Sequence, residues 1–246
     1  MRKIGIWLRN AIIIMFIMSL FFVVLYKFVP VYYTPLMFIR GYEQLRESRP
    51  FSIQHEWVPI DEISQQLVQA VVASEDNLFL VHNGFDYDQI EIAKQEAKKG
   101  KRQRGASTIS QQASKNVFLW PGKSYIRKGL EAYFTVLIEF VWGKQRIMEV
   151  YLNSIEMGEG IYGAEAVSQL HFNKLAAELT TQESALIAVT LPNPRKMNSA
   201  HPGAYMLKRQ EKIVSLMGKI MQVNFGRKPN DDTDKPLVRQ RKKWRG

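Results

Sequence analysis

The sequence predicts an all-α protein in which one helical domain follows a single N-terminal transmembrane helix. Three observations support this fold class. An apolar, uncharged segment lies close to the N-terminus; the segments after it place apolar residues three and four apart, as amphipathic helices do; and the alternating pattern of a half-buried strand is nearly absent. A length of 246 residues is enough for one good-sized core.

The N-terminal segment has the features of a membrane anchor. Arg2, Lys3 and Arg9 precede an uncharged run of 17 residues from Asn10 to Tyr26, near the short end of the roughly 17–25 residues that span a bilayer. No small-x-small cleavage site follows, which counts against a signal peptide, and apolarity on all faces counts against a buried core helix. The preceding basic residues predict a cytoplasmic N-terminus, so the remainder is expected outside the inner face of the membrane.

The composition limits the classes of partner. Hydrophobic residues make up 46% of the chain and charged residues 23%, which argues against wholesale disorder. The formal net charge of +11 predicts an anionic partner: nucleic acid, acidic lipid or a phosphorylated substrate. The predicted location outside the cytoplasm counts against nucleic acid. The absence of cysteine excludes disulfides and thiolate chemistry.

We divide the chain into three parts. Residues 1–40 contain the cytoplasmic N-terminus and the transmembrane anchor, and residues 41–225 form the helical domain. Residues 226–246 form a basic tail, predicted to be disordered because it is charged and contains proline.

The domain is expected to begin with a connector and then a run of helices. Residues 41–58 are polar and aromatic, and Pro50 and Pro59 discourage a continuous helix there. Helical spacing begins after Asp61, which suits an N-cap, and continues to Glu75. Further helices are expected, in order, over residues 88–98, from residue 107, and over 124–142, 144–155, 162–172, 181–191 and 204–221.

Local signals mark several of these boundaries. Two capping boxes stand at helix starts: Thr108 with Gln111, and Thr180 with Glu183. The segments "EMGEGIYG" and "LPNPRKMN" are rich in glycine, proline and asparagine and are predicted to be loops.

Two adjacent carboxylates stand where the first helix of the domain ends. Glu75 lies on or beside the apolar face at the negative pole of the helix dipole; the dipole and partial burial both raise the pKa of a carboxylate, which suits a general acid or base. A solvated helix end would explain Glu75 and Asp76, but not Phe79, His82 and Gly84 after them. We expect His82 to form hydrogen bonds within the loop and to shape the acidic site.

The segment "RGASTISQQASKNVFLW" places a small-residue loop before a helix. Free backbone N–H groups at the start near Ser107 and Thr108 would attract a phosphate. On an ideal helix Gln111, Gln112 and Lys115 share one side and face the same cleft. A well-capped structural helix is the alternative; it explains the serine, threonine and glutamines, but not the mixed polarity of the "ASKN" face.

The segment "RKGLE" carries the third set of charged residues. Arg127 and Glu131 are four residues apart, with Lys128 beside them. A surface ion pair of this kind would contribute under about 1 kcal/mol and would indicate no function. The helix continues as "AYFTVLIEFVW", however, and a charged face on a largely buried helix usually faces a cleft. Arginine is also suited to a diphosphate, which it binds through two parallel hydrogen bonds.

Two other features have open interpretations. The basic segment over residues 98–104 is either a solvated loop or a surface that steers an anionic lipid head group. The four histidines are too scattered in the sequence for a metal cluster, so we assign none of them to zinc.

Together the three sets of residues resemble the signature motifs of the family 51 glycosyltransferases, the peptidoglycan transglycosylases. The first motif matches Glu75, Asp76, Phe79, His82 and Gly84; the second matches Gly105 through Asn116; the third matches Arg127, Lys128 and Glu131; and the fourth matches Lys144, Ile147, Met148, Glu149, Tyr151, Leu152 and Asn153. Four motifs in order are highly specific.

The match extends from about residue 60 to residue 200, and no transpeptidase domain follows, so the chain resembles the monofunctional, membrane-anchored members. The resemblance implies a lysozyme-like helical core for the glycosyltransferase domain over residues 41–225. Met197 departs from the pattern, because relatives often carry an aromatic residue there.

The resemblance also implies a reaction. The substrate would be lipid II, and the enzyme would transfer the growing lipid-linked glycan onto its 4-hydroxyl, with inversion, to form a β-1,4 bond and release undecaprenyl diphosphate. Glu75 would be the general base, and Lys115 and Arg127 would stabilise the departing diphosphate. Glu131 would orient these cations or help to hold a divalent cation, Mg or Mn. Ser107, Thr108, Gln112, Asp76 and Lys128 would bind the substrate in the same site.

The implied setting is the bacterial inner membrane, crossed once, with the catalytic domain outside the cytoplasm. The membrane anchor would keep the enzyme in the plane of its lipid-linked substrate. No organic cofactor is implied, and other cell-wall synthesis or division proteins are candidate partners. A lysozyme or lytic-transglycosylase type of glycan-cleaving enzyme is the alternative, although it would need no diphosphate clamp. A membrane-tethered scaffold for acidic polymers is the non-enzymatic alternative.

Overall fold

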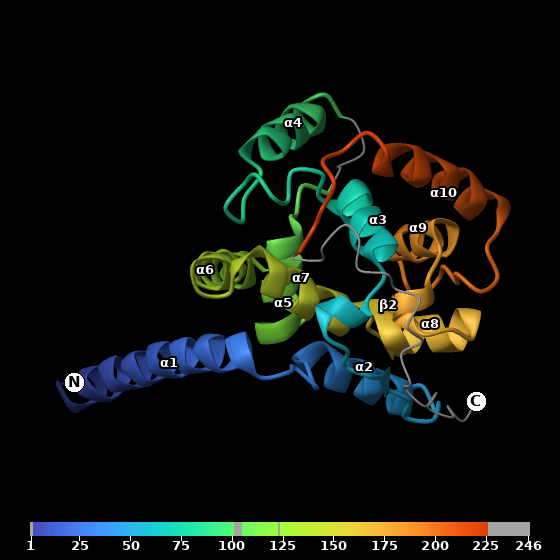
Figure 1. The fold of residues 1–246 in the computed structure, drawn as a ribbon. Coiled ribbons are helices and arrows are strands. Elements are labelled where there is room, and N and C mark those ends of the chain that lie inside the picture. The colour runs from blue at the N-terminus through green and yellow to red at the C-terminus, as the bar shows by residue number, and fades with distance from the viewer. Residues whose placement is uncertain (1, 101–104, 123, 226–246) are drawn as a thin grey trace.

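The fold was analysed in a computed structural model that describes residues 2–100, 105–122 and 124–225 (Figure 1). The predicted all-α class with an N-terminal apolar helix is confirmed. The α-helices are α1 (Arg2–Phe28), α2 (Pro35–Arg46), α3 (Gln65–Glu75), α4 (Tyr87–Lys98), α5 (Ile109–Phe118), α6 (Tyr125–Val141), α7 (Gly143–Ser154), α8 (Ala164–Phe172), α9 (Thr181–Thr190) and α10 (Ala204–Met217). Short 3-10 helices cover Ile60–Glu62 and Ala176–Glu178.

Side-chain caps fix several helix starts where the sequence predicts them. The Thr108 hydroxyl accepts a hydrogen bond from the Gln111 backbone N–H, and Thr180 caps α9 with Glu183 in the same way. Ser124 caps α6 by accepting from the Arg127 backbone N–H. Each cap satisfies a backbone donor that the first turn of a helix leaves free.

The start of α3 is displaced from its predicted position. Asp61 lies in the 3-10 helix, and Ser64 is the N-cap instead, with its hydroxyl oxygen accepting from the Gln66 N–H at 3.2 Å. The same hydroxyl donates to the Leu179 carbonyl at 2.8 Å, so a tertiary contact helps to fix this cap.

Two segments predicted to lack regular structure are ordered. Helix α2 covers part of the expected connector and crosses the predicted domain boundary at residue 40; it starts at Pro35, a position where proline suits a helix, and Thr34 caps it. The loop "EMGEGIYG" contains strands β2 (Glu156–Gly158) and β3 (Ile161–Tyr162), so α8 starts after Tyr162 rather than at it.

The strands form one small three-stranded sheet in the order β1-β3-β2. Strand β1 (Gln54–His55) pairs in parallel with β3, and β2 pairs with β3 in the antiparallel sense. The sheet therefore joins the segment before α3 to the segment before α8.

The core of the domain has two groups of helices. Helices α3, α9 and α10 pack on one another, and α5 packs on α6 and α7 (Figure 1). Fully buried side chains such as Leu67, Ile109, Tyr151 and Ile187 come from both groups. The C-terminal end of α3 meets the N-terminal end of α5 between the groups, and this junction positions the site.

Helix α1 projects from the domain, with its N-terminus at the far end (Figure 1). Within the described residues it contains the single segment, Lys3–Phe28, that is long and apolar enough to cross a membrane. Its C-terminal part is bonded to the domain: Trp142 Nε1 donates to the Val23 carbonyl at 2.7 Å, and Arg146 Nη2 donates to the carbonyl of Tyr26 at 2.8 Å. The basic segment beyond Gly100 and the tail from residue 226 lie outside the described residues.

Candidate active site

A cleft of about 460 Å³ opens where α3 ends and α5 begins. Its wall contains five of the predicted site residues: Glu75, Asp76, Ser107, Thr108 and Gln112. A second hollow of about 510 Å³ lies against α4 and is lined by Lys128 and by Ile90, Ala93, Lys94 and Ala97 of α4. The two hollows share the segment Gly105–Ser107. The site therefore consists of two adjoining compartments, one acidic and one beside the basic cluster.

Glu75 is the last residue of α3 and has the electrostatics of a general base. Burial raises the pKa of its carboxyl, and a hydrogen bond from Gln112 lowers it in part. Gln112 Nε2 donates to Glu75 Oε2 at 2.9 Å, and the Tyr151 hydroxyl donates to Gln112 Oε1 at 3.3 Å. The predicted direction of the pKa shift is thus confirmed, and the amide is held by a buried tyrosine.

Asp76 differs from Glu75 in that both of its carboxylate oxygens form hydrogen bonds within the fold. Oδ1 lies 2.8 Å from His82 Nε2, and Oδ2 accepts from the Ile109 backbone N–H at 2.9 Å. His82 Nδ1 accepts from the Gly84 N–H at 3.2 Å, so Nε2 carries the proton and donates to Asp76. The predicted hydrogen bonding of His82 within the loop is confirmed. Asp76 links the loop after α3 to the start of α5.

Gly84 and Phe79 hold the loop in place. Gly84 has φ +87°, and a Cβ there would lie 2.8 Å from Thr135 Cγ2, so only glycine fits without strain. Its carbonyl accepts from the Thr108 hydroxyl at 2.7 Å. Phe79 is fully buried, with Lys144 Nζ 4.7 Å from its ring centroid.

Two side chains at the start of α5 form hydrogen bonds within the fold and not toward the cleft. The Thr108 hydroxyl accepts from the Gln111 N–H and donates to Gly84, and the Gln111 amide oxygen accepts from the Thr108 N–H at 3.1 Å. Gln111 therefore does not join Gln112 in the cleft as predicted, because its amide completes the capping box and it lines the second hollow. Ser107, just before the cap, borders both compartments.

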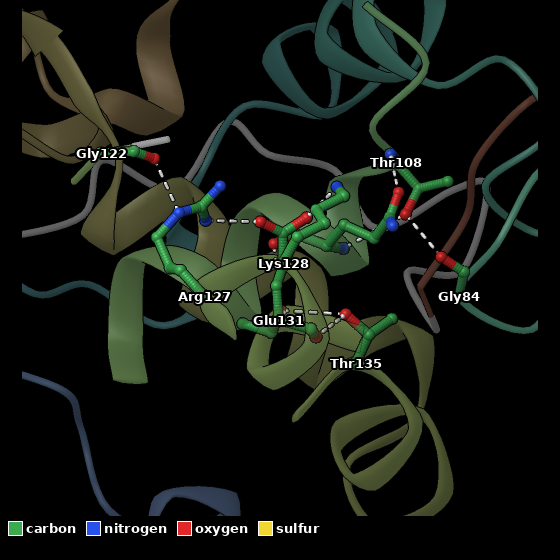
Figure 2. A network of polar contacts seen from close by, with 9 residues as sticks. Gly84, Thr108, Gly122, Arg127, Lys128, Glu131 and Thr135 are labelled. Atoms are coloured by element: carbon green, nitrogen blue, oxygen red, sulfur yellow. Dashed lines mark hydrogen bonds and ion pairs between the residues drawn. The ribbon is translucent and has the colours of Figure 1, made fainter. Parts of the chain in front are cut away.

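The "RKGLE" segment forms a charge cluster on α6 around the buried Glu131, with Lys128 half exposed (Figure 2). Arg127 Nη1 donates to Glu131 Oε2 at 2.7 Å, and Lys128 Nζ donates to Glu131 Oε1. Only 3% of Glu131 is exposed, and Arg127 Nε also donates to the Gly122 carbonyl at 2.7 Å. The predicted grouping of Arg127, Lys128 and Glu131 is confirmed, and Glu131 fixes both cations.

Lys115 interacts electrostatically with charged residues of both compartments, although it does not line either of the two hollows as predicted. Burial lowers the pKa of its ammonium group, and the nearby carboxylate of Glu131 raises it in part; Glu75 acts in the same sense as Glu131, more weakly. The structure therefore relates Lys115 electrostatically to both predicted catalytic carboxylates.

The predicted option of a divalent cation at Glu131 does not fit the side chains. Arg127 and Lys128 occupy both carboxylate oxygens. Nowhere in the described part of the chain do three His, Cys, Asp or Glu side chains form a group that could hold a metal ion.

The acidic compartment also contains one cation that the sequence does not predict. Arg209 on α10 lines the cleft with Glu75 and lowers the pKa of its carboxyl electrostatically. A single arginine on an amphipathic helix more than a hundred residues from Glu75 carries no local signal of this position.

Comparison with known proteins assigns the chain to a family. The family model described as "Transglycosylase" matches residues 43–218. A Bacteroides thetaiotaomicron protein named biosynthetic peptidoglycan transglycosylase is 53% identical over 98% of this chain and 97% of its own length. Proteins of the same name from Bdellovibrio bacteriovorus (50% identical; 85% of this chain, 84% of theirs) and Caulobacter vibrioides (48%; 87% and 92%) are also similar. This protein belongs to the transglycosylase family.

Proposed function

We propose that this protein polymerises the glycan strands of peptidoglycan from lipid II at the two adjoining compartments. The observation that carries the proposal is the pairing of a buried carboxyl of raised pKa, Glu75, with a cation cluster across the shared Gly105–Ser107 rim. The names and high identity of the relatives support glycan synthesis. A lytic enzyme would have no use for the cluster.

The reaction follows from the two compartments. Glu75 accepts the proton of the 4-hydroxyl of lipid II, and that oxygen attacks the anomeric carbon of the lipid-linked strand from the face opposite the diphosphate. The new C–O bond forms as the bond to the diphosphate breaks, which inverts the anomeric centre and leaves undecaprenyl diphosphate. The electron pair of the broken bond leaves with the diphosphate, whose charge requires stabilisation.

The cationic residues have separate parts in this step. Arg127 and Lys128 are held by Glu131. Their remaining N–H donors would bind the diphosphate, because charged donors form strong hydrogen bonds to phosphate. Lys115 would add to the stabilisation of the diphosphate, and its electrostatic interaction with both Glu131 and Glu75 supports this role. Ser107 lines both hollows, which supports a role in binding both substrates. Gln112 orients the Glu75 carboxylate. Thr108 and Asp76 support the site by holding its walls together.

Anchoring by α1 would hold the site close to the membrane. We assign the N-terminus to the cytoplasm and the domain to the outer side of the bacterial inner membrane, because Arg2, Lys3 and Arg9 precede the apolar segment. A lipid-linked substrate then reaches the cleft by diffusion in the same membrane.

The test supplies purified lipid II to the full-length protein in detergent and follows glycan length. Wild type should lengthen glycan, and Glu75→Gln should lower the rate by about 10²–10⁴-fold, the usual contribution of a general base. Glu211→Gln, an exposed change on α10, should match wild type. Shortening of a preformed strand would support the lytic alternative, and binding without turnover would support the scaffold.

A further inference from the structure

The fourth signature motif contributes a buried hydroxyl group beside the acidic compartment. Tyr151 on α7 belongs to this motif, and its side chain is fully buried. Burial raises the pKa of its hydroxyl well above the ordinary value, and the carboxylates of Glu75 and Asp76 act in the same sense. The hydroxyl therefore keeps its proton at any pH at which the enzyme works, and it acts only as a hydrogen-bonding group.

The Tyr151 hydroxyl has one hydrogen-bond partner in the described part of the chain, the side-chain oxygen of Gln112. The distance from the hydroxyl oxygen to Gln112 Oε1 is 3.3 Å. A buried hydroxyl proton without an acceptor is costly, so Tyr151 donates to this oxygen. Gln112 Oε1 is thereby occupied, while Gln112 Nε2 donates to Glu75 Oε2 at 2.9 Å. Side chains from α7, α5 and α3 thus form one chain of hydrogen bonds that all point toward Glu75.

The two orientations of the Gln112 amide have opposite effects on Glu75. With Nε2 toward Glu75, the amide stabilises the carboxylate, which can only accept. Turned by half a rotation, the amide would present Oε1, which repels the carboxylate and accepts a hydrogen bond from the protonated acid. The turned amide would also place Nε2 against Tyr151 and leave the hydroxyl proton without its acceptor. Tyr151 therefore favours the first orientation whichever form Glu75 takes.

The charged groups around Glu75 act independently of this orientation. Arg209 on α10 and Lys115 on α5 lower the pKa of the Glu75 carboxyl, and Asp76 raises it. Helix α9 also packs on α3, and its one charged residue, Glu183, is paired with Lys174. Among the described residues, the hydrogen bonds of Tyr151 reach Glu75 through the Gln112 amide and through none of these charges.

We infer that Tyr151 is a positioning residue for the proposed base: it holds the Gln112 amide with its N–H group toward Glu75 both before and after proton transfer. The inference rests on the proposed function of Glu75. Before the transfer, the amide keeps the carboxylate available as an acceptor. After it, the new O–H group of Glu75 faces an amide nitrogen that cannot accept, so the proton is released more readily and the base is restored for the next addition.

The test is the pH dependence of kcat/KM for polymerisation of purified lipid II by the full-length protein in detergent. Tyr151→Phe removes one oxygen atom and keeps the ring in the core, so the variant should fold. The freed amide can turn its oxygen to protonated Glu75, so the acidic limb should move to higher pH by about half to one unit, the effect of one neutral hydrogen bond.

Tyr162→Phe is the matched control for the loss of a buried hydroxyl. Tyr162 is as fully buried as Tyr151, and its hydroxyl has no hydrogen-bond partner among the described residues. The acidic limb of this variant should match that of wild type.

A double substitution separates positioning from a general effect on the core. In a Gln112→Ala background, Tyr151→Phe should produce no further shift, because the amide is absent. An unshifted limb in Tyr151→Phe, an equal shift in Tyr162→Phe, or a further shift in the Gln112→Ala background would overturn the inference. If Glu75→Gln loses turnover while the limb of Tyr151→Phe is unshifted, only positioning by Tyr151 is rejected. Full turnover in Glu75→Gln would reject the proposed base and this inference together.

Discussion

Gln112 Nε2 donates a hydrogen bond to Glu75 Oε2 over 2.9 Å, so one amide supports the ionised form of a carboxyl whose burial favours the protonated form. Burial is the larger effect, and the pKa of Glu75 remains above its ordinary value. The pair therefore sets the pH at which the proposed base becomes available.

Gln112→Ala should move the acidic limb of the kcat/KM profile to higher pH. The hydrogen bond from Gln112 lowers the pKa of Glu75 and burial raises it, so removing the amide raises this pKa further. A hydrogen bond to a charged group contributes about 1.5–3 kcal/mol, which corresponds to a shift of about one to two pH units. Gln89→Ala, which alters another residue of the cleft that has no bond to Glu75, is the control and should leave the limb in place. An unchanged limb in Gln112→Ala would refute this role of the amide.

Glu75→Gln should make the protein more stable at pH 8 although it abolishes most turnover. The native state holds the Glu75 proton more tightly than the unfolded state, so stability falls as pH rises from the ordinary pKa of 4.5 through the raised one. At pH values above the raised pKa, the loss in the free energy of unfolding is constant, at about 1.4 kcal/mol for each unit of pKa shift. Thermal unfolding in detergent should show a higher Tm for the variant at pH 8 and no difference at pH 4. A lower Tm at pH 8 would contradict the burial argument.

Glu131→Ala should destabilise the protein by about 3–5 kcal/mol, because it leaves the largely buried Arg127 without its partner. Turnover should fall as well, since Arg127 and Lys128 lose their fixed positions. Glu159→Ala is the matched control: it breaks an ion pair with Arg49 in which Glu159 is 46% exposed, and should cost less than about 1 kcal/mol. Unfolding by urea measures both, and equal losses would indicate that burial of Glu131 adds nothing.

Two glycine-to-alanine changes should have opposite signs. Gly84→Ala forces a Cβ into Thr135 at positive φ and should cost about 1–3 kcal/mol. Gly129→Ala, within α6 and with open space around it, should add about 0.5–1 kcal/mol through helix propensity. The Tm of each variant in detergent is the measurement. Stabilisation by Gly84→Ala would show that the loop relaxes around the new side chain.

Local chemistry explains which parts of the fold the sequence predicts. Thr108, Ser124 and Thr180 cap helices through groups three residues away, and such contacts are visible in a short window of sequence. Ser64 is harder to identify, because its hydroxyl is also engaged by a carbonyl near residue 180, and Asp61 offered an equally good local cap.

The features that were missed depend on distant partners. Gln54 pairs with Ile161 in a sheet whose strands are two or three residues long, too short to show alternation. Arg209 reaches the acidic compartment only because α10 packs on α3. The motifs identified the residues of the predicted site. They did not indicate that Thr108 and Asp76 form hydrogen bonds within the fold. The roles of these two residues toward substrate stay predictions.

Trp142 and Arg146 donate hydrogen bonds to main-chain carbonyls of α1, so the domain is attached directly to this helix without an intervening linker. With α1 in the membrane, the height of the cleft above the bilayer is therefore set by the depth of this helix.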